Sequence, residues 1–428
     1  MKLRNQLIVG FGLGLGFIIV PQVVFAQPML VAQETTPASQ ASALQFFQSG
    51  VNQLNAQEYQ NAIDSFNRAL NLTPNYSPAY LYRGIAYAAL GNSEAAIADY
   101  TQAAQITPGY TDAFFYRGIA YAKQGSTFQA IADFDQVIAL DSKRADAYLH
   151  RGSVRAAIQD QPGALADFDR SIDLNSDNAA AYLNRGSVYF ELGRSQEALK
   201  DLSRAIELDP NSAIAYYNRG FVYTTQNAPR SALVDFTRAI ELQPDYAQAF
   251  LARSIVQEKL GNDSAALGDV DRAIALNNNS PEAYKLRGDL RQQAGDTTGA
   301  IVDYDQALTL RPEYADAYRG RADARVAIGG DTGYTANNQM PQFLAIQPES
   351  AAETTEVGDQ AGALADYTQA IRLNPNDADA YFNRGKVYVS IGEPDAARTD
   401  FQRAANLFLQ QGQPESYRQV IKAVRSLP

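Results

Sequence analysis

The chain offers few of the side chains on which enzymes usually depend. It has no cysteine and a single histidine, His150, among 428 residues. Disulfides, thiolate metal sites and catalytic cysteines are therefore excluded. A single histidine also nearly excludes a histidine-based catalytic triad and a metal site built from histidines. The sequence also lacks a phosphate-binding loop, a nucleotide fingerprint, a nucleophile elbow and a zinc motif. It predicts a protein that is not an enzyme, that needs no cofactor and no metal, and whose His150 is a surface residue.

Charged residues are the remaining source of chemistry. Asp and Glu number 47 against 36 Lys and Arg, a net charge of −11, which argues against nucleic acid or an anionic membrane as partner. The acidic residues are spread along the chain and do not converge on one site. Nine arginines and nine aspartates nevertheless recur in matched order: Arg83 with Asp99, Arg117 with Asp133, Arg151 with Asp167, Arg185 with Asp201, Arg219 with Asp235, Arg253 with Asp269, Arg287 with Asp303, Arg321 with Asp366, and Arg384 with Asp400. We interpret them as structural ion pairs, and an anion-binding arginine ladder is the alternative.

An internal repeat of 34 residues positions these pairs. Ten repeats begin at residues 43, 77, 111, 145, 179, 213, 247, 281, 315 and 378. Position 4 of every repeat is aromatic, position 8 is Gly, Ser or Ala, position 20 is Ala, and position 24 is bulky. Positions 4, 8 and 11 share one face of a first helix, and positions 20, 24 and 27 share one face of a second. Small residues at 8 and 20 let the two backbones approach closely, while Gly at position 15, as in Gly91, Gly125, Gly193 and Gly261, ends the first helix.

The repeat carries a recognisable motif. Tyr-x2-Arg-Gly-x2-Tyr, followed by Ala-x3-Tyr and Pro, stands at Tyr80, Arg83, Gly84, Tyr87, Ala96, Tyr100 and Pro108. It resembles the tetratricopeptide repeat, over residues 43–411, although position 7 is Arg in nine repeats where the family usually has Leu. The resemblance implies an all-α solenoid of ten helix-turn-helix repeats wound into a right-handed superhelix. The arginine pairs with an aspartate at position 23 of the same repeat, because the first repeat lacks both.

The resemblance also implies a binding groove lined by the first helices. Repeat positions 2, 5, 6, 9, 12 and 13 would face it. As partner-binding residues it indicates Phe115, Tyr116, Asn184, Phe190, Tyr217, Asn218, Phe221, Lys285 and Arg319. Aromatic anchors beside amides suit an extended peptide or a helix, whereas the alternative for each residue is unused surface.

The ends of the chain and one insertion lie outside this pattern. Residues 1–26 have a positive start, an apolar run and small residues at Val24 and Ala26, which predicts a signal peptide; a retained N-terminal anchor is the alternative. Residues 27–42 are interpreted as a flexible linker. Residues 330–358 interrupt the ninth repeat, either as a solvated insertion or as a partner-binding loop. Residues 412–428 are predicted to form a capping helix over the last repeat.

These features together predict an exported scaffold or adaptor that binds one or more proteins through its groove. Its expected location is the periplasm or another extracytoplasmic compartment, with membrane contact only through an uncleaved N-terminal segment. It resembles tetratricopeptide scaffolds exported by bacteria, including cyanobacteria, which implies a role in assembling envelope or photosynthetic-membrane complexes. Two alternatives stay open, an adaptor for an envelope protease and a glycan-binding or glycan-active envelope protein.

Overall fold

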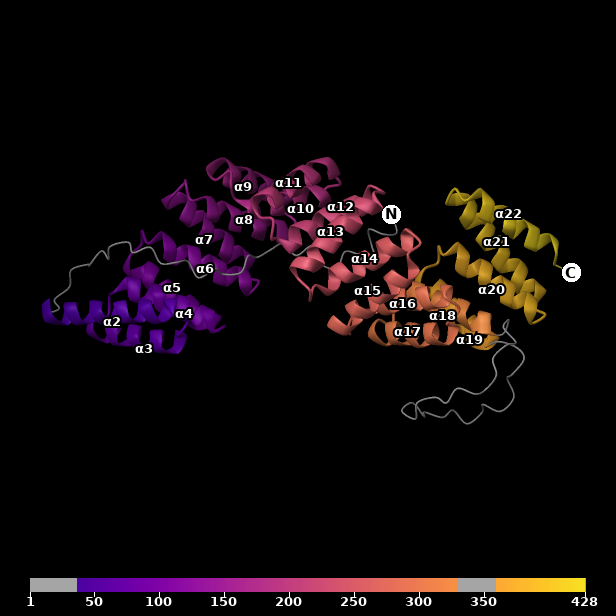
Figure 1. Cartoon of the computed structure of the whole chain (residues 1–428), viewed down its shortest axis with the longest axis horizontal. Helices are drawn as coiled ribbons and strands as arrows, with labels where there is room; N and C mark the ends of the chain where they lie inside the picture. Colours follow the sequence, from indigo (N-terminus) through magenta and orange to yellow (C-terminus); the bar gives the residue numbers. More distant parts are fainter. Residues whose placement is uncertain (1–36, 329–358, 428) are drawn as a thin grey trace, which may run out of the picture. The chain divides into compact units, whose positions relative to one another are not determined.

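The computed structural model describes residues 37–328 and 359–427, so the predicted signal peptide and the insertion at 330–358 lie outside the described residues. All regular structure in the described ranges is helical, in consecutive antiparallel pairs (Figure 1). The chain divides at Gln226 and Asn227 into two parts. The α-solenoid class predicted from the sequence is confirmed, while the right-handed winding and the number of repeats stay predictions.

The N-terminal part holds eleven described helices. Each of its first five repeats contributes a first helix and a second helix that pack against each other, and each of these first helices also contacts the first helix of the next repeat. The helices are α2 (Pro37–Asn55), α3 (Tyr59–Leu72), α4 (Ser77–Ala89), α5 (Ser93–Ile106), α6 (Thr111–Lys123), α7 (Thr127–Leu140), α8 (Ala145–Ala157), α9 (Gln161–Leu174), α10 (Ala179–Glu191), α11 (Ser195–Leu208) and α12 (Ala213–Thr225).

The C-terminal part continues the same pairing within itself. Its described helices are α13 (Pro229–Leu242), α14 (Ala247–Lys259), α15 (Asp263–Leu276), α16 (Pro281–Gln293), α17 (Thr297–Leu310), α18 (Ala315–Ile328), α19 (Gln360–Leu373), α20 (Ala378–Ser390), α21 (Pro394–Gln410) and α22 (Pro414–Arg425). The last helix, α22, covers the apolar end of α21 with the fully buried Val420, as a solenoid terminus requires.

The start of α2 differs from the sequence interpretation. The linker is predicted to reach residue 42, but α2 begins at Pro37. A proline is tolerated in the first turn of a helix, and the Ala, Ser and Gln residues that follow add no strong helix breaker. The helix of the first repeat therefore extends back into the segment interpreted as a tether.

Two local features of the repeat explain why the helices pair so regularly. The residue at position 15 has a positive φ in most repeats, as in Gly91 (78°), and the non-glycine residues Gln57, Gln159 and Asn227 adopt the same conformation there. At position 8 a Cβ added to Gly118 would lie 2.9 Å from the ring of Phe134 at position 24. The first helix can approach the second only because this position is so small.

Candidate functional site: the inner face of the first helices

The matched arginines and aspartates form the most regular polar feature of the molecule. Eight of the nine predicted pairs have both members in one part of the chain, and all eight are ion pairs in the structure. In the pair of Arg185 and Asp201, Nε and Nη2 of the arginine donate to the two carboxylate oxygens at 2.6 and 2.8 Å. The ninth pair, Arg219 and Asp235, has its members in different parts.

Each arginine also reaches the preceding repeat, which sequence reasoning missed. The Nη1 atom donates to the side chain at position 25 of that repeat, for example Arg185 to Asp169 at 2.7 Å and Arg253 to Thr237 at 3.3 Å. The same guanidinium lies about 5.5 Å from the centre of the position-4 ring, as with Tyr182. Burial lowers the pKa of Arg185, but its hydrogen bonds to the two aspartates raise the pKa more, so it stays charged.

We call this arrangement the arginine clasp: the position-7 arginine, its position-23 aspartate and the position-25 group of the preceding repeat. Three of the five guanidinium N–H groups already donate to these two partners, as in Arg185. The clasp therefore joins helices within a repeat and repeats to one another. The geometry favours a structural role over the alternative of an anion-binding ladder.

The inner face, defined here as the first-helix surface that carries positions 2, 5, 6, 9, 12 and 13, differs from its prediction. Five of the predicted partner-binding residues are buried and are not available to a partner: Phe115, Asn184, Tyr217, Asn218 and Phe221. Asn184 Nδ2 donates to Ser153 Oγ at 3.0 Å, and Asn218 Nδ2 donates to Ser187 Oγ at 3.1 Å. Both bonds join position 6 of one repeat to position 9 of the preceding repeat, so these amides hold adjacent first helices together.

The buried aromatic residues have equally clear internal roles. The guanidinium of Arg144 lies 4.1 Å from the centre of the Phe115 ring, and Tyr217 stacks on Phe221 at 6.4 Å. Burial raises the pKa of Tyr217 to about 12. Phe190 is half-buried with its ring 5.6 Å from that of Phe221. These side chains fill space between the first helices because large rings at positions 5 and 9 face the neighbouring repeat as well as the groove.

The two predicted cations lie on the inner face of the C-terminal part and are both half-buried. Lys285 forms an ion pair with Asp289 one helical turn away. Arg319 is held between Asp316 at 3.3 Å and Asp377 at 3.1 Å. Their positive charge is already compensated, so neither presents a free cation to an incoming ligand.

His150 is not the exposed side chain that its sequence position suggests. Its ring stacks on Phe134 at 5.8 Å and meets Phe115 edge-on. Burial lowers the pKa of His150 below its ordinary value of 6.5, so the ring is neutral at physiological pH. The histidine is therefore part of the packing between first helices.

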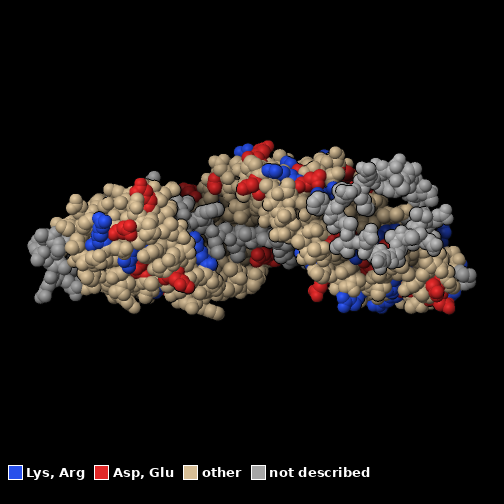
Figure 2. Space-filling model, turned by 90° about the horizontal axis from the view of Figure 1, so that it is seen from below, with Lys and Arg blue, Asp and Glu red and all other residues tan. Residues whose placement is uncertain are grey.

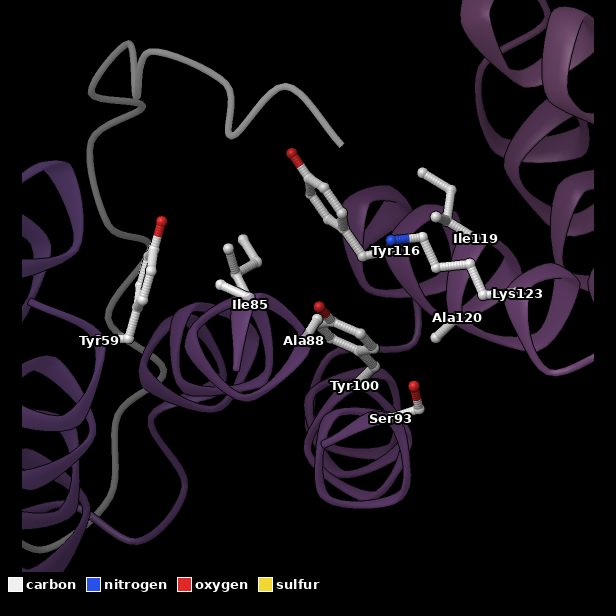
Figure 3. A pocket seen from close by; sticks show the side chains of 10 residues that line it. Tyr59, Ile85, Ala88, Ser93, Tyr100, Tyr116, Ile119, Ala120 and Lys123 are labelled. Carbon is white, nitrogen blue, oxygen red and sulfur yellow. The ribbon is translucent and has the colours of Figure 1, made fainter. Parts of the chain in front are cut away.

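A pocket lies on the inner face of the N-terminal part (Figure 3). Its volume is about 250 Å³. Ile85, Ala88 and Ala89 of α4, with Ile119 and Ala120 of α6, form its apolar surface, and Tyr59, Ser93, Tyr100, Tyr116 and Lys123 complete the lining. Of the predicted partner-binding residues only Tyr116 contributes, because the pocket draws on three successive repeats rather than on one helix.

Comparison with known families decides the identity of the fold. The sequence matches the family described as TPR repeat over residues 86–125, 152–193, 186–227, 288–329 and 355–392. Further tetratricopeptide repeat families match residues 65–98, 112–143, 213–246 and 378–410. The chain belongs to the tetratricopeptide repeat (TPR) family. No curated protein matches it.

Solved TPR structures resemble the chain at low identity. A tetratricopeptide repeat protein from Parabacteroides merdae is 18% identical, covers 59% of this chain and 99% of its own, with a TM-score of 0.48. YrrB, described as a TPR protein with an unusual peptide-binding site, is 24% identical, covers 44% of this chain and 97% of its own, with a TM-score of 0.37. Cut9–Hcn1 of the APC/C is 13% identical and covers 89% of this chain and 99% of its own, with a TM-score of 0.45.

Membership of the TPR family indicates a scaffold for protein–protein interaction, and such scaffolds are generally not enzymes. In the described ranges no helix is long and apolar enough to cross a membrane, and no group of three or more His, Cys, Asp or Glu side chains is placed to hold a metal ion. On the face shown in Figure 2, basic and acidic side chains are interspersed rather than gathered into patches of one sign. That face offers no continuous basic surface for nucleic acid.

Proposed function

We propose that this TPR protein is an exported scaffold that holds a segment of another protein, an extended peptide or a helix, against the inner face of its first helices. The observation that carries the proposal is the pocket of the N-terminal part. This pocket combines apolar surface with the side chains of three tyrosines, a serine and a lysine. Apolar anchoring beside a few polar groups is how helical grooves select peptide segments.

Export is the second element of the proposal, and it rests on the N-terminal sequence. Lys2 and Arg4 precede an apolar run that ends before Ala26, the arrangement of a secretory signal. N-terminal sequencing of the protein from its native cells is expected to begin at Gln27. An intact N-terminus in the membrane fraction would instead show a retained anchor.

The proposed role in assembling envelope or photosynthetic-membrane complexes is the broadest use of such a scaffold, and an adaptor for an envelope protease is a special case of it.

The glycan alternative loses support from the structure. It relied on tyrosines and asparagines of the groove with scattered carboxylates, yet Asn184 and Asn218 are buried and donate to serines of the neighbouring repeat.

A crosslinking experiment in cells tests the scaffold function. The photoreactive residue p-benzoylphenylalanine is placed at Ala180, an exposed inner-face position, and separately at Phe128, which is 79% exposed on the second helix α7. We expect irradiation to join a specific protein to the inner-face variant and not to the Phe128 variant. Equal crosslinking from both positions, or none from Ala180 and from Ala89 in the pocket, would refute binding on the inner face.

A further inference from the structure

We propose that the pocket between α4 and α6 is an anchor site for a peptide segment in which a bulky apolar side chain stands next to a carboxylate. The inference rests on the proposed scaffold function and narrows it to one site and one ligand chemistry. Three observations carry it: the size and apolar lining of the pocket, a tyrosine hydroxyl inside it that bonds no described residue, and a lysine at its edge that forms no ion pair with a described residue.

The size of the pocket favours a single side chain over a complete small molecule. Its volume of about 250 Å³ lies below the roughly 300–1,000 Å³ typical of drug-sized ligand sites. Ile85, Ile119 and the small Ala88 and Ala120 supply the apolar surface. The rings of Tyr100 and Tyr116, 6.1 Å apart and nearly parallel, add an aromatic wall. Such a lining suits Leu, Met or Phe.

The repeat itself shows that the Tyr100 hydroxyl lacks its usual partner. Tyr304 and Tyr367 occupy the same position 24 in later repeats, and their hydroxyls donate to Asp289 at 2.8 Å and to Asp323 at 2.5 Å. Those aspartates stand at position 9, where the repeat of Tyr100 has Ile85 instead.

The Tyr100 hydroxyl donates to no described residue, and Figure 3 shows it among the side chains that line the pocket. Burial raises the pKa of Tyr100, so the hydroxyl stays protonated and keeps its donor. The hydroxyl opens into the pocket, where water can reach it while the pocket is empty. An acceptor on the ligand, a peptide carbonyl or carboxylate, would satisfy it.

Lys123 supplies the charge preference. It is exposed at the end of α6, it forms no ion pair with a described residue, and its amino group points toward Tyr116 of the same helix (Figure 3). On the same face of other repeats, Lys285 and Arg319 pair with aspartates, and Lys259 and Lys386 donate to asparagines. In a chain of net charge −11, an unpaired ammonium beside an apolar pocket favours an anionic group on the occupant.

Three labelled peptides test the proposal on the full chain by fluorescence anisotropy. Each is a fluorescein-tagged Gly-Ser nonapeptide with Phe-Asp, Phe-Asn or Ser-Asp at its centre. We expect the Phe-Asp peptide to bind about two- to fivefold tighter than Phe-Asn, from one partly exposed charge pair. It should bind at least about tenfold tighter than Ser-Asp, from burial of the ring.

Two variants assign these preferences to the pocket. Lys123→Gln should remove the preference for Asp over Asn, and Ala88→Phe, which fills the pocket, should remove the preference for Phe over Ser. The matched controls are Lys259→Gln and Ala122→Phe, which change the same repeat positions outside the pocket and should leave both preferences intact. Circular dichroism checks that each variant folds. If Ala88→Phe does not fold, Lys123→Gln still tests the pocket, because Lys123 is exposed and its replacement should not disturb the packing.

The outcomes separate this inference from the scaffold function. Equal binding of the three peptides, or preferences unchanged by both pocket variants, would overturn the anchor site even where crosslinking from Ala180 shows a partner. If light scattering shows that the protein is an oligomer and that Ala88→Phe converts it to a monomer, that result would identify a second copy of the chain as the occupant of the pocket. It would overturn the peptide anchor site as well. Absence of crosslinks from the whole inner face would refute the scaffold function itself.

Discussion

The arginine clasp makes a quantitative prediction about coupling between two side chains. The perturbations are Arg185→Leu, Asp201→Leu and the double variant. Asp201 is 5% exposed, and its two oxygens accept hydrogen bonds from Arg185 at 2.6 and 2.8 Å. Replacing Arg185 leaves a buried carboxylate without its partner, which costs about 3–5 kcal/mol. Replacing Asp201 should cost less, because Arg185 keeps Asp169, which is 54% exposed and accessible to water.

The double variant should lose less stability than the two single losses added together. With both charges replaced by leucine no group is left buried and unpaired, so we expect a coupling free energy of about 1–3 kcal/mol. Because repeat arrays need not unfold in one step, urea unfolding followed by circular dichroism should be combined with hydrogen exchange on α10 and α11. The exchange data report the local free energy of opening at the clasp.

A matched control comes from the same helix pair. Arg204 pairs with Glu207 on the surface, where both side chains are largely exposed. Arg204→Leu should change the opening free energy by less than about 1 kcal/mol. Strictly additive losses for Arg185 and Asp201, or losses no larger than for Arg204, would refute the reasoning that the clasp is a coupled, desolvated pair.

Three further predictions follow from the packing. The folded-state pKa of His150 lies below the ordinary 6.5, so the unfolded chain binds the proton more readily and stability should fall as the pH drops below about 6.5. His150→Phe should show a smaller decrease in melting temperature between pH 7.5 and 5. Gly118→Ala should destabilise by about 1–2 kcal/mol in urea, since its Cβ would lie 2.9 Å from a buried ring, whereas Gly109→Ala, with open space around it, should stay within about 0.5 kcal/mol. Asn184→Ala should cost about 1–3 kcal/mol, and less once Ser153→Ala has removed its acceptor.

The fold was predictable because the same residue types recur at the same packing positions in all ten repeats. Small residues at position 8 and bulky ones at position 24 predict two helices in close contact, and the structure has this contact at Gly118 and Phe134. The parallel occurrence of Arg185 and Asp201 with their equivalents indicated an ion pair between the helices. Regular sequence positions thus carried enough information to place neighbouring helices.

The contacts between repeats were harder to predict. Position 25, which accepts the third bond of each arginine, carries a polar side chain in the nine repeats before a clasp, as in Asn67 and Asp169. That regularity was a usable signal. Asn184 was misplaced because helical periodicity separates the faces of one helix and does not reveal which side chains the next repeat covers. The repeat pattern did not predict the pocket for a related reason, because its lining residues Tyr59, Tyr100 and Lys123 come from different repeats.

Comparison between repeats offers an internal control that single-domain proteins lack. A side chain that serves the scaffold should recur with its partner, as each clasp arginine does with its aspartate. A side chain that keeps its place but loses its partner needs another explanation, and Tyr100 is such a case, since Ile85 stands where Asp289 and Asp323 serve the equivalent tyrosines. The Tyr100 hydroxyl lines the pocket and bonds no described residue, so an acceptor on a bound peptide would give it the partner that the repeat does not supply. The departure from the repeat is therefore better explained by a ligand than by the scaffold, and the peptide experiment decides between the two.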